Sequence, residues 1–202
     1  MKLYYTPGAC SMAVHISLHE AGLQFELEKV DLKTKRTAAG EDFTQINPKG
    51  YVPALRLEDG SVLTEVSACL QYVADQAPQT DLIPVSGTME RYRLLEWIGF
   101  ISTEIHKTFG PLFDPSLPED ARPRQIALLT KRFGYLAGQL SGRQHLTGDR
   151  FTVADAYLFT VLNWTKVVKI DLGPWPVLVD FVSRVSGRPA VRETMKAEGL
   201  TP

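Results

Sequence analysis

Short apolar runs and polar turns alternate over the first third of the chain. Residues 2–5, "KLYY", have the aromatic content and brevity of a strand, and the Pro-Gly pair that follows breaks regular structure. From Ser11 the apolar residues recur near a helical period, and Gly22 stands where a glycine commonly ends a helix. Residues 25–32 alternate between apolar and polar side chains, which predicts a strand with one irregularity.

The next segment predicts a hairpin and a helix. Residues 33–43 are mostly polar and indicate a loop with a short helix, whereas residues 51–65 indicate a hairpin around a tight Asp-Gly turn. An apolar helical pattern then runs to residue 77. The order is therefore β-α-β-α-β-β-α, and the segment 78–88, "PQTDLIPVSGT", reads as a linker.

Beyond the linker the pattern contains only helical periods. The predicted helices span roughly 89–113, 119–141, 152–169, 175–187 and 189–198. We therefore expect a small α/β domain over residues 1–80 and an all-helical domain over residues 88–202.

Two helices of the second half have informative faces. In the first, one stripe is apolar and should face the core: Leu94, Ile98, Ile101 and Ile105. Another stripe carries small residues and one imidazole: Gly99, Ser102, Thr103, His106 and Gly110. Such a stripe either lets a second helix approach closely or leaves an open groove.

In the helix predicted over residues 152–169, Thr152 and Asp155 have the spacing of an N-terminal capping box, and Phe151 can pack onto the following turn as a hydrophobic staple. We therefore expect Thr152 and Asp155 to stabilise the fold.

Composition narrows the possible functions. The chain has 202 residues, of which 44% are hydrophobic and 22% charged, with a net charge of −1. This balance is typical of a soluble globular protein and does not suggest nucleic acid or an anionic membrane as a partner. We see no signal peptide and no apolar run of about 20 residues. Two cysteines are too few for a disulfide scaffold and fit a reducing cytoplasm.

Cys10 is the first candidate for chemistry. It directly precedes a helix, whose unpaired N–H groups and dipole favour a thiolate by about 0.3–1 kcal/mol. The alternative is a buried, inert thiol, which is the reading that suits Cys69 on an apolar helix face. Ala13 stands where a second cysteine would complete a redox pair, so any thiol chemistry of Cys10 needs an external thiol.

Two further motifs carry weaker signals. Val52-Pro53 leads into a short strand, but only about 5–6% of such bonds are cis in folded proteins. Glu65 opens a helix whose N–H groups can hold a carboxylate while the acid holds an ammonium group, as an α-amino acid requires. An acid at a helix start is also common for the sake of the dipole alone.

Taken together, these stretches resemble the glutathione transferases, and specifically the bacterial beta class. The resemblance runs in order along nearly the whole chain, through "PGACS", "NPKGYVPAL", "LTE", "STEIHK" and "FTVADAYLF". It implies a thioredoxin-like N-terminal domain of four strands and three helices, a cis bond before Pro53 and an all-α C-terminal domain.

The resemblance also implies a site for glutathione, with no metal. The N-terminal contacts it implies are Cys10, Ser11, Lys35, Val52, Pro53, Glu65 and Val66. Those of the helical half, which can come across a homodimer interface, are Gly99, Thr103, Glu104, His106 and Lys107. Cys10 and His106 are the implied catalytic pair, with the imidazole in an open groove. Relatives often carry Ser or Gly at position 66 and Asn at position 99, so two polar contacts are missing here.

We therefore expect a cytoplasmic, homodimeric enzyme acting on glutathione and a small apolar electrophile. Either glutathione's own thiolate attacks carbon, or Cys10 forms a mixed disulfide that glutathione resolves. A non-catalytic ligand-binding or partner-binding protein on the same fold is the alternative. Candidate aromatic residues for the electrophile site are Tyr92, Trp97, Phe109, Phe113 and Trp164. The spacing of the remaining histidines does not place them in a predicted site, so we expect them to be partly exposed surface residues: His15, His19 and His145.

Overall fold

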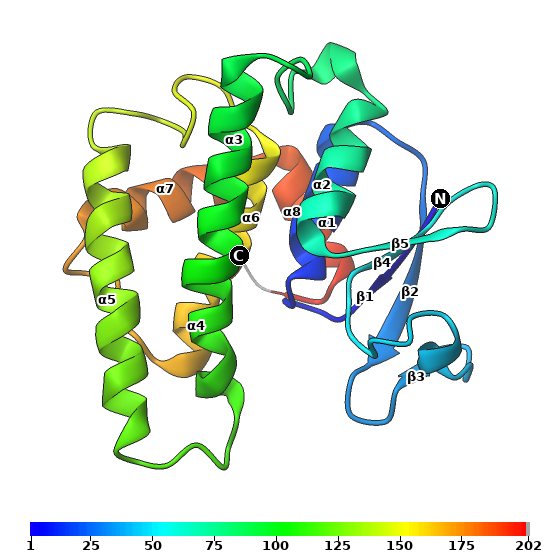
Figure 1. Cartoon of the computed structure of the whole chain (residues 1–202), viewed down its shortest axis with the longest axis horizontal. Coiled ribbons are helices and arrows are strands. Elements are labelled where there is room, and N and C mark those ends of the chain that lie inside the picture. Colours follow the sequence, from blue (N-terminus) through cyan, green and yellow to red (C-terminus); the bar gives the residue numbers. More distant parts are fainter. Residues whose placement is uncertain (201–202) are drawn as a thin grey trace. The chain divides into compact units, whose positions relative to one another are not determined.

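The computed structural model describes residues 1–200, which form two compact units (Figure 1). The first unit contains Met1–Ile83 together with the segment from Gly187 onward, and the second contains Pro84–Ser186. The division falls within the linker expected from the sequence.

The first unit is built on a mixed β-sheet with the strand order β3-β2-β1-β4-β5. Its strands are β1 (Lys2–Tyr5), β2 (Glu26–Asp31), β3 (Arg36–Thr37), β4 (Ala54–Arg56) and β5 (Val62–Thr64). The central strand β1 runs parallel to β2 and antiparallel to β4, with Leu3 opposite both Leu27 and Leu55.

The two faces of the sheet bury different sets of side chains. Tyr5 points to the face covered by α1 (Ser11–Glu20), where its ring lies 6.0 Å from that of His15. Tyr4 points to the other face, where it packs on Phe43 in a cluster that the loop before β4 closes. This alternation follows from the two-residue period of a strand. Helix α1 packs in turn on α2 (Val66–Asp75) and α8 (Pro189–Ala197).

Residues 33–43 depart from the expected loop with a short helix. The segment instead forms β3 and leads into a single 3₁₀ turn, η1 (Phe43–Gln45), while a second such turn, η2 (Pro78–Thr80), follows α2. Asp42 caps η1 by accepting a hydrogen bond from the Thr44 N–H. Phe43 is the one buried residue of η1, so the segment lacks the apolar stripe that would sustain a longer helix.

The last helix also differs from the sequence-based expectation, which placed it in the helical domain. Helix α8 packs against α1 and belongs to the first unit. The physical reason is a buried polar contact just after α8, where Glu198 hydrogen-bonds to His15 of α1. That contact joins residues 183 positions apart, so it could not be predicted from the local pattern of hydrophobic residues.

The second unit consists of helices. They are α3 (Met89–Phe100), the π-helical η3 (Ile101–His106), α4 (Lys107–Phe109), the 3₁₀ turn η4 (Gly110–Phe113), α5 (Ala121–Leu140), α6 (Val153–Val168) and α7 (Pro176–Ser186). The expected core stripe is confirmed, because Leu94, Ile98, Ile101 and Ile105 are all buried. Helix α6 is buried along most of its length, and the predicted Thr152–Asp155 capping box is present at its start. Among the described residues, no helix combines the length and the apolar character that crossing a membrane requires.

Candidate functional site

Cys10 is the N-cap residue of α1, as the sequence predicts. Its side chain is half-buried, and its Sγ donates to the backbone carbonyl of Val52 at 3.2 Å. A thiol can make this contact and a thiolate cannot, so the carbonyl favours the protonated form while the helix N-terminus favours the anion. A group that stabilises the anion can therefore shift Cys10 between the two forms.

Ser11 has no exposed surface, and its contacts are those of a structural residue. Its hydroxyl lies between the N–H of Thr6, at 3.2 Å, and the carbonyl of the same residue, at 3.3 Å. These bonds close the loop that carries Cys10 into α1. Contact between Ser11 and glutathione stays a prediction.

Cys69 is the inert thiol that the sequence indicates. It is fully buried on α2, and burial raises the pKa of its thiol to about 12. It is therefore protonated at neutral pH and unreactive as a nucleophile.

The Val52–Pro53 peptide bond is cis, as the resemblance implies. Both residues are buried, and the Val52 carbonyl faces the thiol of Cys10. Lys35 reaches the same loop, since its Nζ donates to the carbonyl of Gly50 at 2.7 Å. Cys10 and Lys35, which come from two different parts of the chain, thus both contact the loop before β4.

Glu65 is the N-cap residue of α2 and has a left-handed backbone, with φ of 71°. Its Oε1 accepts hydrogen bonds from Lys49 Nζ at 2.5 Å and from Tyr51 Oη at 2.9 Å. Bonds to this carboxylate raise the pKa of both donors. Lys49 and Tyr51 were not among the residues expected from the sequence, although both belong to the "NPKGYVPAL" motif. Because a lysine ammonium already sits on Glu65, its carboxylate is placed to hold an ammonium group.

Val66 follows Glu65 and begins α2, so its backbone N–H belongs to the open first turn of that helix. Its side chain is 7% exposed and contributes to the core. Glu65 and the start of α2 together offer a carboxylate beside backbone N–H donors, which is the pair of groups that an α-amino acid end requires.

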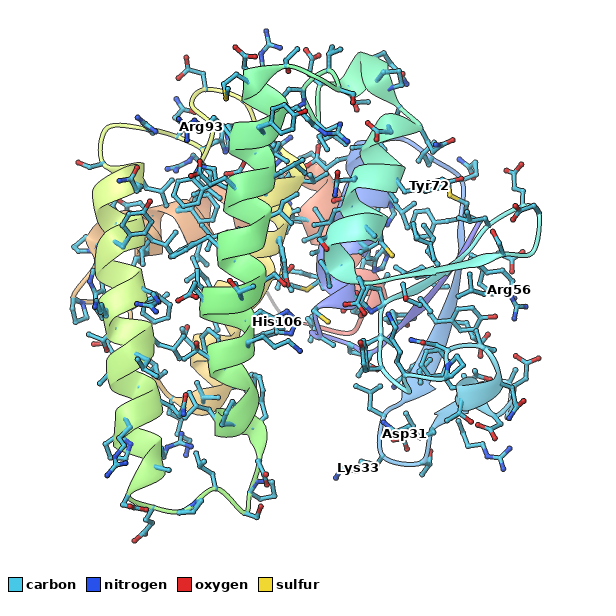
Figure 2. The ribbon with its side chains drawn as sticks, viewed as in Figure 1. Asp31, Lys33, Arg56, Tyr72, Arg93 and His106 are labelled. Atoms are coloured by element: carbon cyan, nitrogen blue, oxygen red, sulfur yellow. The ribbon has the colours of Figure 1, made fainter. Side chains whose placement is uncertain are left out.

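His106 lies in the second unit, at the end of the π-helical segment η3, where Figure 2 labels it. Its Nδ1 is 2.6 Å from the hydroxyl of Tyr157 on α6. The ring of Trp164 meets the imidazole edge-on, with centroids 4.8 Å apart. The ring is therefore held by a hydrogen bond and by packing, a feature that the sequence argument did not foresee.

The other residues expected to contribute from the helical half are exposed or half-exposed. Gly99 is exposed, and a side chain added there would meet no atom within 4 Å. Thr103 donates its hydroxyl hydrogen bond to the Gly99 carbonyl at 3.1 Å. Glu104 forms an ion pair with Arg132 of α5, and Lys107 is exposed. Whether any of them contacts glutathione stays a prediction.

The interpretation of the remaining histidines as surface residues was wrong for two of them. His15 is fully buried between α1 and the residues that follow α8, and His145 is 6% exposed. His19 is partly exposed, as expected, with 27% of its side chain accessible. Among residues 1–200 no cluster of three or more His, Cys, Asp or Glu residues could hold a metal ion.

Comparison with known proteins decides the family. Residues 8–76 match the glutathione S-transferase N-terminal domain, and residues 100–189 match the glutathione S-transferase C-terminal domain. The chain is also 46% identical to glutathione S-transferase GstA of Escherichia coli O157:H7, over 99% of this chain and all of that protein. This chain belongs to the glutathione S-transferases.

Two solved structures refine the class of this transferase. The bacterial beta-class glutathione S-transferase of Sphingomonas chungbukensis has 44% identity and a TM-score of 0.97 over the full length of both chains. A sphingomonad glutathione S-transferase complexed with glutathione has 45% identity and a TM-score of 0.96, again over both full chains. The transferase therefore belongs to the bacterial beta class and has the thioredoxin-like and all-α domains of its family.

Proposed function

We propose that this transferase binds glutathione on its first unit and transfers thiol groups through Cys10. The observation that carries the proposal is the placement of a half-buried thiol at the start of α1, 3.2 Å from the Val52 carbonyl. The sphingomonad relative was solved with glutathione bound, which supports glutathione as the ligand.

Glu65 and the start of α2 are proposed to hold the γ-glutamyl end of glutathione. The carboxylate would take the ammonium group in place of Lys49, and the N–H groups of the first turn would take the carboxylate. We also propose that the remaining expected residues, including Lys35 and His106, contact glutathione. We further propose that the protein is a homodimer, which light scattering would test, and that it is cytoplasmic, which cell fractionation would test.

Thiol transfer follows a balanced two-step sequence. The Cys10 thiolate attacks the glutathionyl sulfur of a mixed disulfide, so that a Cys10–glutathione disulfide forms as the original S–S bond breaks. The other sulfur leaves as a thiolate and takes up the proton that Cys10 gave up. A second glutathione, as its thiolate, then attacks that disulfide. The products are glutathione disulfide and regenerated Cys10. No other side chain can replace sulfur in the first step.

Conjugation of glutathione to an apolar electrophile is the second reaction that we propose. It needs glutathione's own sulfur as an anion, and a second thiolate nearby would oppose that ionisation. The Cys10 thiol, which already donates a hydrogen bond in this structure, would instead donate to the glutathione sulfur. Conjugation should therefore depend less on Cys10 than thiol transfer does.

The variant Cys10→Ala separates these roles. With glutathione saturating, it should lose nearly all reduction of mixed disulfides while keeping measurable conjugation of a chloro-nitroaromatic test substrate. Loss of conjugation with disulfide reduction retained would reverse the assignment. Absence of both activities in the wild-type protein would favour a non-catalytic binding protein.

Glu65→Ala tests the clamp separately, by calorimetry with glutathione. Loss of a charged hydrogen bond should weaken binding by about 1–3 kcal/mol, or about 5- to 150-fold. Glu58→Ala is the matched control, because Glu58 is an exposed acid on the neighbouring hairpin. Equal affinities for the two variants would show that Glu65 does not hold the ligand.

A further inference from the structure

The helix that carries His106 changes its winding over the six residues that end at His106. Residues Ile101–His106 are π-helical, between the α-helical α3 and α4. A π-turn inserts one extra residue and rotates the side chains that follow, and such turns are frequent at functional sites. Ile101 and Ile105 remain fully buried through the segment, so the core contact of the helix is kept across the change in winding.

Tyr157 meets His106 from a rigid element. It lies on α6, it is 1% exposed, and its hydroxyl is 2.6 Å from His106 Nδ1. Helix α6 is fixed at its start by the capping box, in which Oδ2 of the buried Asp155 accepts from the Thr152 N–H, and Oδ1 accepts from the Leu146 N–H as well. Tyr157 follows that cap by two residues. The hydroxyl is therefore held in place before any ligand arrives.

Packing fixes the plane of the imidazole as well. The rings of His106 and Tyr157 are nearly perpendicular, at 88°, and the ring of Trp164 meets the imidazole at 74°. Phe109 and Phe113 both pack edge-on against Trp164, which holds that ring in turn. The imidazole therefore has one preferred orientation.

The hydrogen bond at Nδ1 also selects a tautomer. A phenol is a much stronger acid than a neutral imidazole N–H, so the favoured pairing has the Tyr157 hydroxyl donating to Nδ1. The proton of the neutral ring then sits on Nε2. An Nε2–H group is a hydrogen-bond donor, which is what an anionic sulfur accepts.

We propose that Tyr157 is a positioning residue that fixes the orientation of His106 and keeps it in the Nε2–H tautomer. The inference rests on the proposed function, because it matters to the reaction only if His106 serves the glutathione or Cys10 sulfur. Tyr157 acts through His106 and has no part in the chemistry itself.

Nitrogen-15 NMR of the histidine side chains in the wild-type protein tests the tautomer without any substrate. The variant His106→Gln identifies the His106 signals among those of the four histidines. We expect a pyridine-like, hydrogen-bonded Nδ1 and a protonated Nε2 at a pH where the ring is neutral. In Tyr157→Phe the signals should move toward the tautomer mixture of a free imidazole. A wild-type signal from Nδ1–H would overturn the proposal, even if Tyr157→Phe failed to fold.

Steady-state kinetics test whether the positioning of His106 by Tyr157 affects the rate of conjugation. With glutathione saturating, Tyr157→Phe should lower kcat for conjugation about two- to tenfold, the effect of one hydrogen bond, while the KM for glutathione changes less. Tyr135→Phe, at a half-exposed tyrosine of α5, is the matched control and should leave kcat unchanged.

A double variant decides whether Tyr157 acts through His106. In a His106→Gln background, Tyr157→Phe should have no further effect on kcat. An undiminished effect there, or an unchanged kcat in the single variant, would overturn the positioning role. If the wild-type protein neither bound glutathione nor turned over substrate, the proposed function would fail while the NMR signature could still stand.

Discussion

The side chain of Glu198 ties the end of the described chain to the loop that precedes Cys10. Its Oε2 accepts a hydrogen bond from the Gly8 N–H at 2.7 Å, and its Oε1 lies 2.8 Å from His15 Nδ1. The side chains of Glu198 and His15 have no exposed surface. Glu198→Ala would therefore leave the fully buried Nδ1–H of His15 and the partly buried N–H of Gly8 without this acceptor.

The expected loss of stability is large. A fully buried donor such as His15 Nδ1–H costs about 1–3 kcal/mol when left unsatisfied, and the partly buried Gly8 N–H adds less, so Glu198→Ala should reduce the free energy of unfolding by about 1–4 kcal/mol. That is a sizeable share of the roughly 5–15 kcal/mol that holds a typical protein folded. At about 2–4 °C per kcal/mol for a chain of this size, Tm should fall by at least about 2 °C. Glu198→Gln keeps one carbonyl oxygen and should lose less.

Urea unfolding followed by circular dichroism measures this loss. Glu193→Ala is the matched control, since Glu193 is an exposed acid of α8 that reaches only as far as His19, 3.4 Å away. It should change stability by no more than about 0.5 kcal/mol. The alkylation rate of Cys10, two residues after Gly8, should also change in Glu198→Ala. Equal unfolding midpoints for Glu198→Ala and Glu193→Ala would refute the account of this contact.

Two further predictions concern titratable groups. In the folded protein iodoacetamide at about pH 8 should label Cys10 and spare Cys69, whose pKa is about 12, and peptide mapping that found both labelled would contradict the burial argument. Burial, helped by the neighbouring His15, lowers the pKa of His19, so the unfolded chain takes up a proton near pH 6.5 before the folded chain does. Stability should therefore fall as the pH drops below about 7, and His19→Gln should lose less Tm than the wild type between about pH 7.5 and 5.5. Equal losses would contradict this cause.

Features with a local cause could be predicted from the sequence. The position of Cys10 at a helix start follows from the Pro-Gly break before it. The Thr152–Asp155 cap follows from a fixed spacing, and the core stripe that includes Ile98 and Ile105 follows from the helical period. In each case neighbouring residues along the chain determine the outcome.

Features that depend on distant contacts could not be predicted this way. The assignment of α8 to the first unit and the burial of His15 both depend on Glu198, 183 residues away from His15. The bond from His106 to Tyr157 spans 51 residues, and His106 ends a π-helical segment for which the sequence carries no simple signal. The cis bond before Pro53 was expected from the resemblance and not from the local sequence.

The environment of Glu65 lies between these cases. Its place at the start of a helix was clear from the sequence, whereas its left-handed backbone and its bonds to Lys49 and Tyr51 were not. These bonds cross from the loop before β4 to the end of β5, so they depend on how the hairpin pairs. They show that the acid is set up to hold a cation.

The central claim, that Cys10 is the sulfur that carries glutathione during thiol transfer, can be tested by trapping the intermediate. The reduced wild-type protein is mixed with glutathione disulfide, quenched with acid, digested and mapped by mass spectrometry. We expect one glutathionyl group on the Cys10 peptide, none on the Cys69 peptide, and release of that group by added glutathione. An enzyme that reduces mixed disulfides while Cys10 stays unmodified would contradict it.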